Sequence, residues 1–353
     1  MLLRRTFNVF CSAFFLLPLA AASSSAAADA PVRIGVLGLD NYQAVAYAQL
    51  MNDPKATGAL AGLKVVAAYP DKASADIPES VDSLPKWKLQ IGAFGVELVD
   101  SIDELLRRSD AIMIMSLDGR RHLEQATPVL KAGKRTFIGR PLAAQFEDAA
   151  KIFELAENTG TPCWSSSQHR FSPGFLGMRN FPEVGRVLGC DVYGGCKPEP
   201  HHAELFWHAV HGIDTLYTIM GPGCVSVSCT STPSAELITG TWSDGRVGTF
   251  RGIKQGALKY SATVFGEKGV STAGVYGHGL PVGGVVPTND KYMGYEGIAI
   301  EMAKFFKGGP VPVPAAETLE LFAFMEAAHE SKRTKGAAVR IDDVLKKVRK
   351  QDK

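Results

Sequence analysis

Short apolar runs alternate with amphipathic stretches through the first half of the chain. Buried-strand patterns are expected at residues 32–38, 63–69, 111–115 and 136–138. Helical patterns are expected at residues 44–50, 102–108, 122–132 and 146–158. Ser101 is placed to cap the second helix, and Gly133 to end the third. Strands that alternate with helices predict an α/β domain with a parallel sheet, whose ligands lie at the carboxyl ends of the strands.

The second half of the chain has a different pattern. Segments rich in β-branched residues and separated by turns predict strands at 187–193, 226–229, 236–241, 247–250 and 260–265. Helices are expected at 206–219, 298–307 and 317–331. These elements predict an α+β domain with a largely antiparallel open sheet. We expect the first domain to cover residues 31–162 and the second to cover residues 163–353.

Residues 1–30 have the pattern of a secretory signal peptide. Arg4 and Arg5 precede an apolar run at 9–22, which has 14 residues and is shorter than the roughly 20 that a membrane span needs. Small residues at 26–30 offer a cleavage site. The run Arg4-Arg5-Thr6-Phe7 is also typical of twin-arginine export, and both export routes stay open. We therefore expect a periplasmic or secreted protein with no stable membrane anchor after cleavage.

Composition narrows the classes of partner. The chain has 353 residues and a net charge of +2, and its body has no basic run interleaved with aromatic residues, so a nucleic-acid partner is not expected. Five cysteines follow the signal segment with no C-x-x-C spacing, which does not predict a disulfide framework. A single disulfide, such as Cys190–Cys196, stays possible.

Several motifs occur in an order that is typical of one family. They are V-R-I-G-V-L-G at 32–38, D-G-R-R-H-L-E-Q-A at 118–126, K-A-G-K-R-T-F-I-G-R-P-L-A at 131–143, H-R-F-S-P at 169–173, V-H-G-I-D at 210–214 and F-F-K-G-G at 305–309. Together they make the mature chain resemble the Gfo/Idh/MocA oxidoreductases. The resemblance implies a Rossmann domain that binds NAD or NADP and a C-terminal domain for substrate and oligomerisation. It also implies a sugar or cyclitol substrate and a homo-oligomer.

The nucleotide loop departs from the family pattern. Aligned with G-x-G-x-x-G, its key positions are Gly38, Asp40 and Gln43, so only the first glycine is kept. The carboxylate of Asp40 would repel a pyrophosphate, although a helix N-terminus still attracts one. The expected nucleotide contacts in this loop are Gly38, Leu39, Asp40 and Asn41. The alternatives are a simple turn at Gly38 and helix capping by Asp40 or Asn41.

The resemblance also places residues after the next strands beside the nucleotide. Asp71 takes the place of the acidic residue that holds the adenosine ribose, and it is equally well explained as a turn residue. Ser116, Asp118 and His122 take places on the nicotinamide side. His122 also suits the first turn of a helix.

The catalytic positions differ from the family as well. Arg140, in Gly-Arg-Pro, replaces the lysine that helps the hydroxyl proton leave, and we expect it to hold substrate because its pKa is too high to shuttle a proton. His211 aligns with the general base, and Trp207 stands where the family has aspartate. His208 is a second candidate catalytic residue. The expected substrate contacts are Arg140, Trp207, Asp214 and Tyr295, with a core position as the alternative for Trp207.

Two other functions stay open. His201, Glu204, His208 and His211 are spaced three, four and three apart, and on one continuous helix they would share a face. Imidazoles and a carboxylate are suitable ligands for zinc, so a metal-dependent hydrolase or lyase is one alternative. The other is a non-catalytic ligand-binding protein, because the family's lysine and aspartate are both missing.

Overall fold

The structure, a computed structural model, describes residues 30–274 and 294–351. The chain forms two units, Met1–Ala30 and Pro31–Lys353, and the account below concerns the second. The expected signal peptide, with Arg4 and Arg5, lies outside the described residues except for Ala30. Within the described ranges, no helix is both long enough and apolar enough to cross a membrane.

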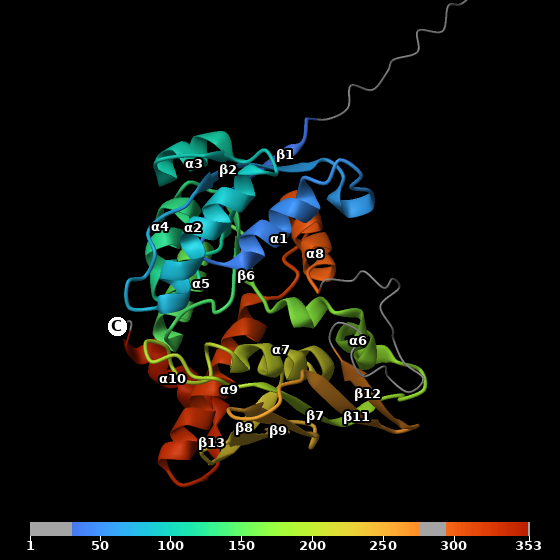
Figure 1. Ribbon diagram of the computed structural model, residues 1–353. Coiled ribbons are helices and arrows are strands. Elements are labelled where there is room, and N and C mark those ends of the chain that lie inside the picture. The colour runs from blue at the N-terminus through green and yellow to red at the C-terminus, as the bar shows by residue number, and fades with distance from the viewer. Residues whose placement is uncertain (1–29, 275–293, 352–353) are drawn as a thin grey trace, which may run out of the picture. The chain divides into compact units, whose positions relative to one another are not determined.

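The first half forms the expected parallel sheet (Figure 1). Its strand order is β3-β2-β1-β4-β5-β6, and every pairing is parallel. The strands are β1 (Val32–Leu37), β2 (Leu63–Tyr69), β3 (Glu97–Leu98), β4 (Ala111–Ile114), β5 (Arg135–Ile138) and β6 (Cys163–Ser165). The helices are α1 (Tyr42–Met51), α2 (Pro78–Gly92), α3 (Ile102–Arg108), α4 (His122–Lys131) and α5 (Phe146–Asn158). The order reverses beside β1 and β4, so a ligand crevice is expected at their carboxyl ends.

The first sheet does not end at the expected domain boundary. β6 begins at Cys163, one residue past that boundary, and pairs with β5. A helix from the second half, α8 (Glu296–Phe306), also packs on α1 and shares a buried core with Val36 and Phe137. The backbone carbonyl of Phe305 accepts a hydrogen bond from Arg135 Nε at 2.8 Å, which fixes α8 to β5.

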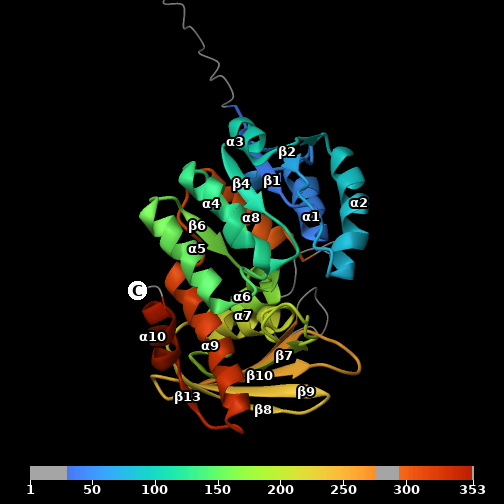
Figure 2. The same ribbon diagram turned by 90° about the vertical axis from the view of Figure 1, so that its left-hand side faces the viewer.

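The second half forms a mostly antiparallel sheet of strand order β12-β11-β7-β10-β9-β8-β13, in which β10 and β7 pair parallel. The strands are β7 (Val187–Gly195), β8 (Cys224–Ser231), β9 (Ala235–Trp242), β10 (Val247–Ile253), β11 (Ser261–Gly266), β12 (Val270–Gly274) and β13 (Val339–Arg340). The helices are α6 (Pro173–Leu176), α7 (Ala209–Met220), α9 (Ala315–Arg333) and α10 (Ile341–Gln351). α7 and α9 cover one face of this sheet (Figure 2).

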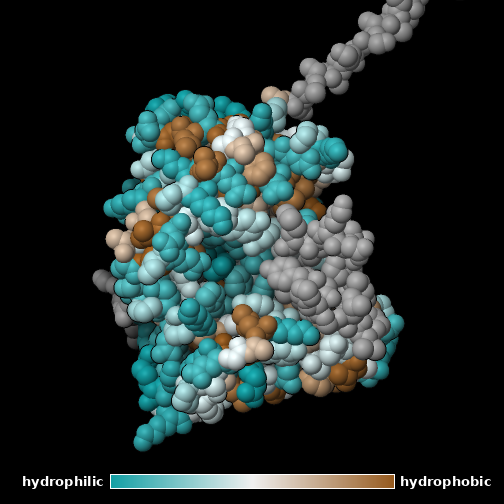
Figure 3. All heavy atoms as spheres, viewed as in Figure 1, coloured by the Kyte–Doolittle hydropathy of each residue, from teal (hydrophilic) through white to brown (hydrophobic). Residues whose placement is uncertain are grey.

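The other face of the second sheet carries exposed apolar side chains. They are Leu188, Leu237, Val247, Phe265 and Val270. Figure 3 shows hydrophobic residues in brown at the lower right, over the β11–β12 end of the sheet. This face therefore has the character of an interaction surface.

The five cysteines after the signal segment are buried and free, so the possible Cys190–Cys196 disulfide is not formed. Burial raises the pKa of the Cys196 thiol to about 12. These side chains therefore act as small apolar core residues.

Candidate active site

Arg140 lies just beyond the carboxyl end of β5, at the edge where ligands of parallel sheets bind. Two of its guanidinium nitrogens, Nε and Nη1, are buried and have no hydrogen-bond partner. Burial lowers the pKa of Arg140, but a guanidinium stays protonated in a protein. Arg140 is therefore a buried positive charge whose donors are not all used by the protein.

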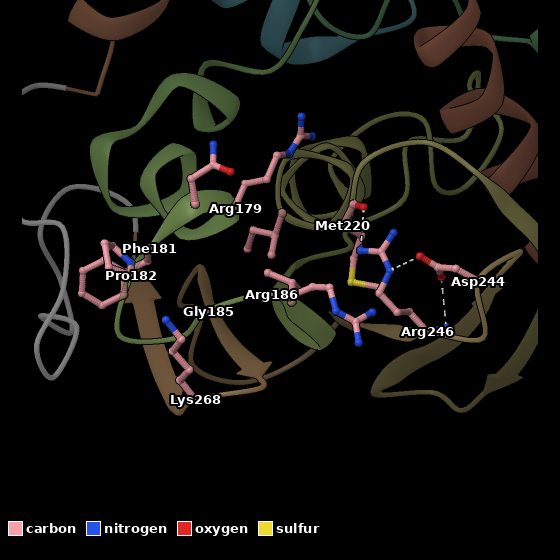
Figure 4. Close-up of a pocket in the computed structure, with 12 residues that line it drawn as sticks. Arg179, Phe181, Pro182, Gly185, Arg186, Met220, Asp244, Arg246 and Lys268 are labelled. Carbon is pink, nitrogen blue, oxygen red and sulfur yellow. Dashed lines mark hydrogen bonds and ion pairs between the residues drawn. The ribbon is translucent and has the colours of Figure 1, made fainter.

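A basic hollow of about 440 Å³ lies beside the C-terminal end of α7 (Figure 4). Two arginines that line it donate hydrogen bonds to other groups of the protein. Arg179 donates to the carbonyls of Tyr217 and Thr218, and Arg246 donates to that of Met220 and to the carboxylate of Asp244. Cations suit the C-terminal end of a helix, so this hollow is explained by capping of α7.

His211 lies in the first turn of α7 and is buried. Its Nδ1 is 2.6 Å from the hydroxyl oxygen of Ser167, and its ring centroid is 4.6 Å from that of His169. Burial lowers the pKa of His211 well below its usual value, and the charges of Arg140, His169 and His208 lower it further. His211 is therefore neutral near pH 7, as a proton acceptor must be.

A buried ion network holds the segment that contacts His211. The carboxylate of Asp214 accepts hydrogen bonds from the backbone N–H of Ser167 and from Arg170, at 2.7 and 2.6 Å. Arg170 also forms an ion pair with Glu317 at 2.6 Å. Both oxygens of Asp214 are occupied, so Asp214 positions Ser167 against His211, and a contact of Asp214 with substrate stays a prediction.

Arg140 and His211 are connected through Ser167 and through charge. Arg140 and Ser167 line a cavity of about 20 Å³, room for about one water molecule, and Ser167 also contacts His211. Arg140 also acts electrostatically on the pKa of His211 and of His169. The catalytic roles of Arg140 and His211 stay predictions.

The remaining members of this site come from four segments. His208 is the N-cap of α7, and its Nδ1 lies 3.2 Å from the carbonyl of Lys197. Burial and the charge of Arg140 lower the pKa of His208 to about 4, and that of His169 to about 3. Tyr260 lies against His169, with ring centroids 4.6 Å apart, and Tyr295 lies edge-on to Tyr47 at the N-terminal end of α8. Both tyrosines act electrostatically on the pKa of Arg140, and the contact of Tyr295 with substrate stays a prediction.

The sequence analysis missed Ser167 and His169. Both belong to the polar run S-S-S-Q-H-R at 165–170, which follows β6 at the same edge of the sheet as Arg140. This polar run could have identified both residues from the sequence, because polar residues directly after a buried strand of a parallel sheet lie at the ligand-binding edge of that sheet.

Trp207 is a core residue. It is buried against Ile77 and Leu117, and its ring centroid is 4.7 Å from that of His202. The expectation that it stacks on a sugar is therefore wrong, and the alternative of a core position is confirmed.

The histidine face proposed for a metal does not form. α7 begins at Ala209, so His201 and Glu204 precede the helix. His201 pairs with Glu199 at 2.8 Å, and Glu204 pairs with Lys332 at 2.5 Å. In the described part of the chain, no cluster of three or more histidine, cysteine or acidic side chains could hold a metal ion.

The nucleotide loop turns at Gly38, whose φ of 87° lies in the left-handed region. A Cβ there would lie 2.2 Å from the hydroxyl of Ser116, so glycine is also required for contact between β1 and β4. Asn41 caps α1 by accepting from the backbone N–H of Gln43, as the capping alternative predicted. Gly38, Leu39, Asp40 and Asn41 are all buried.

Asp40 forms internal hydrogen bonds. Its carboxylate accepts from the hydroxyl of Ser80, on α2, at 2.5 Å and from the backbone N–H of Leu117 at 2.9 Å. Burial raises the pKa of Asp40, against the effect of these hydrogen bonds. The second position of the glycine fingerprint is therefore filled by a buried carboxylate that ties three segments together.

The other expected nucleotide contacts are also engaged. Asp71 accepts from Arg121 and Gln125, both at 2.7 Å, and its φ of 58° is a turn conformation. Asp118 is buried and accepts from Ser74 at 2.6 Å and from Arg120. The hydroxyl of Ser116 accepts from Gln125.

His122 is fully buried between two backbone carbonyls. Its ring nitrogens lie 2.9 Å from the carbonyl of Ser116 and 3.1 Å from that of Leu142. The expectation of a cofactor contact is therefore wrong for His122, which instead joins the ends of β4 and β5.

These contacts decide how well the chain fits a dinucleotide. The N-terminus of α1 suits a pyrophosphate. The carboxylate of Asp71 suits a ribose by its place, but both of its oxygens already accept hydrogen bonds, from Lys72, Arg121 and Gln125. The open hollow near Asp71 is lined by Lys72 and Arg120 together with Asp76 and Asp118, which pair with Arg120. The carboxylate of Asp40 does not suit a pyrophosphate, so the fit is poor at the phosphate loop.

Comparison with known proteins agrees with the fold. Residues 32–167 match the Gfo/Idh/MocA family, described as an oxidoreductase family with an NAD-binding Rossmann fold. The chain is 28% identical over 141 residues to inositol 2-dehydrogenase 3 of Saccharopolyspora erythraea, which is 37% of this chain and 40% of that protein. It is 30% identical over 87 residues to myo-inositol dehydrogenase Hyg17 of Streptomyces leeuwenhoekii, 25% and 27% of the two chains. The chain thus spans less than half the length of either relative.

Solved structures extend the likeness over the second domain. The structure of scyllo-inositol dehydrogenase from Lactobacillus casei, with bound NAD(H) and scyllo-inositol, matches with a TM-score of 0.66 and 16% identity. The match covers 88% of this chain and 99% of that one. The two-domain fold, with a parallel sheet followed by a mostly antiparallel one, is therefore shared.

Proposed function

We propose that this chain, whose residues 32–167 match the NAD-binding domain of the Gfo/Idh/MocA oxidoreductases, oxidises a hydroxyl group of a sugar or cyclitol. The observation that carries the proposal is that Arg140, just beyond the carboxyl end of β5, lies near enough to His211 on α7 for its charge to lower the pKa of that histidine. Two relatives of this chain, inositol 2-dehydrogenase 3 and myo-inositol dehydrogenase Hyg17, are inositol dehydrogenases, which supports a polyol as substrate. We further propose export across the cytoplasmic membrane, on the signal pattern of residues 1–30.

His211 acts as the general base in this proposal. When Nδ1–H of His211 donates to the hydroxyl oxygen of Ser167, Nε2 carries the lone pair and accepts the proton of the substrate hydroxyl. When bound, NAD(P) would supply the acceptor for the hydride of the carbon that bears this hydroxyl, which is thereby oxidised to a carbonyl. Arg140 donates hydrogen bonds to substrate oxygen and cannot shuttle the proton, because its guanidinium does not titrate near neutral pH.

The test is formation of reduced nicotinamide by the purified full-length chain with NAD⁺ or NADP⁺ and a panel of cyclitols and sugars. The wild type should turn over at least one of them, and His211→Ala should lose about 10²–10⁴-fold in rate while it keeps nucleotide affinity. A His211→Ala variant with full activity would exclude His211 as the base.

The second candidate function is a non-catalytic ligand-binding protein. The buried hydrogen bond between Ser80 and Asp40 favours it, because it holds a carboxylate in the loop where a dinucleotide would place its pyrophosphate. Titration with NAD(H) and NADP(H) separates the two candidates. Nucleotide binding supports the oxidoreductase, and its absence at millimolar nucleotide supports the binding protein.

A further inference from the structure

The charges around Arg140 do not balance. The side chains that most favour its charged form are Tyr295, Tyr260, Glu79 and Tyr47, of which Glu79 alone is a carboxylate. Glu79 is exposed, and in the described part of the chain no carboxylate lies within ion-pair distance of Arg140. His169, His208 and His211 are neutral neighbours, since the charge of Arg140 contributes to the lowered pKa of each.

The protein treats its other buried arginine differently. Arg170, which lines the same small cavity, forms ion pairs with both Asp214 and Glu317. A buried charge without a partner destabilises a protein strongly. Among the residues that the structure describes, one guanidinium is therefore compensated twice, and that of Arg140, at the carboxyl end of β5, has no carboxylate partner.

We propose that the substrate carries a carboxylate that binds Arg140, so that the substrate class is a sugar acid or another polyhydroxy acid. The inference rests on the proposed function and narrows it. An incoming carboxylate supplies both the missing negative charge and the acceptors that Nε and Nη1 lack. Arg140 stands where the Gfo/Idh/MocA motif has lysine, and this difference also favours a carboxylate ligand. A guanidinium suits carboxylate recognition better than an ammonium does.

The cavity beside Arg140, of about 20 Å³, has room for about one water molecule and is also lined by Arg170 and Asp214. Both carboxylate oxygens of Asp214 accept hydrogen bonds, from Ser167 and from Arg170, so Asp214 compensates Arg170. The size of this cavity does not separate a carboxylate from a phosphate, so the titration below includes a sugar phosphate.

The experiment is isothermal titration of the full-length chain, with and without NAD⁺, using D-glucuronate, D-gluconate, D-glucose and D-glucose 6-phosphate. A sugar acid should bind at least about tenfold more tightly than glucose, the gain expected from one charge-assisted hydrogen bond. Arg140→Gln should abolish the preference, and Arg140→Lys should keep part of it. The control Arg186→Gln, at an exposed arginine paired with Glu267, should bind as the wild type does.

Three results would overturn the inference: glucose binding as tightly as the acids, a preference that survives Arg140→Gln, or glucose 6-phosphate binding more tightly than either acid. Folding of each variant is checked by circular dichroism. The outcomes also separate this inference from the proposed function. A sugar acid that binds without reducing NAD⁺ refutes the redox function and leaves the carboxylate site. Oxidation of a neutral polyol, without preference for acids, refutes the carboxylate site and leaves the redox function.

Discussion

Ser167 forms the hydrogen bond that orients the imidazole of His211, the proposed base. Its hydroxyl lies 2.6 Å from His211 Nδ1, and its backbone N–H donates to Asp214. If this contact fixes the tautomer of His211, Nε2 is left to accept the proton. Ser167 is thus a positioning residue, and its contribution is separable from that of His211.

We predict that Ser167→Ala lowers kcat about five- to tenfold with little change in KM, because one hydrogen bond is worth about 1 kcal/mol. Steady-state kinetics measure the split between the two constants. Ser167→Thr, which keeps the hydroxyl, should restore most of the lost rate. A change confined to KM, or a failure of threonine to rescue, would show that Ser167 does not orient the base.

The sequence identified single candidate residues better than it identified the partners that contact them in the fold. Arg140 and His211 were identified because each aligns with a motif position of the family that the chain resembles, and the charge of Arg140 lowers the pKa of His211. The role of Asp214 was not foreseen, and that of Trp207 was foreseen only as an alternative. Whether a polar or aromatic side chain is open to substrate depends on partners distant in sequence, Arg170 for Asp214 and Leu117 for Trp207.

At the level of elements, the residue at which α7 begins excludes the metal site that the sequence left open. α5 has the predicted bounds, whereas α7 begins at Ala209 instead of 206. The metal hypothesis needed a helix that reached back to His201, and Pro198 and Pro200 precede that residue. α2 was not predicted because Ser80 and Ile91 are its only buried residues, so it lacks an apolar period.

The hydrogen bond between Asp40, in the β1–α1 loop, and Ser80, on α2, should oppose nucleotide binding. Asp40→Gly removes a carboxylate from the phosphate loop, so we predict tighter binding of NAD(H) in a fluorescence titration. The same change leaves Ser80 and the N–H of Leu117 without their acceptor and should lower the free energy of unfolding by about 1–3 kcal/mol.

Ser80→Ala is the matched control for that prediction. It breaks the same hydrogen bond but keeps the carboxylate, so it should destabilise the protein without improving nucleotide affinity. Equal or weaker binding by Asp40→Gly would show that the pyrophosphate does not lie over this loop.

For the whole molecule, buried histidines set the pH dependence of stability. Burial lowers the pKa of His169 to about 3 and that of His211 well below its usual value. Below about pH 6.5 the unfolded chain binds protons at these residues and the folded chain does not. Stability is therefore complete above that pH and is lost as the pH falls toward the folded pKa values.

We predict that the free energy of unfolding falls between about pH 6.5 and pH 5, by up to about 1.4 kcal/mol per pH unit for each such histidine. Urea denaturation across this range measures the slope. His211→Ala should flatten it by up to one proton. A wild type with constant stability over the same range would mean that these histidines are already charged in the folded protein.

The exposed face of the second sheet should join copies of the chain. Val247 on β10 is 45% exposed, and Val81 on α2 is 44% exposed. Val81 is therefore a control of equal exposure that lies outside this sheet. We predict a homo-oligomer by light scattering, with Val247→Asp weakening it and Val81→Asp leaving it unchanged. A monomeric wild type, or equal effects of the two substitutions, would exclude this sheet face as the interface.

Transfer of deuterium is the most direct test of the proposed chemistry. The full-length protein is incubated with NAD⁺ and a polyol or sugar acid deuterated at the reacting carbon, and the nicotinamide is examined by mass spectrometry. We predict that one deuterium moves from carbon to the nicotinamide with the wild type and that His211→Ala transfers it far more slowly. Unlabelled nicotinamide with every substrate of the panel would contradict the assignment of Arg140 and His211 to hydroxyl oxidation.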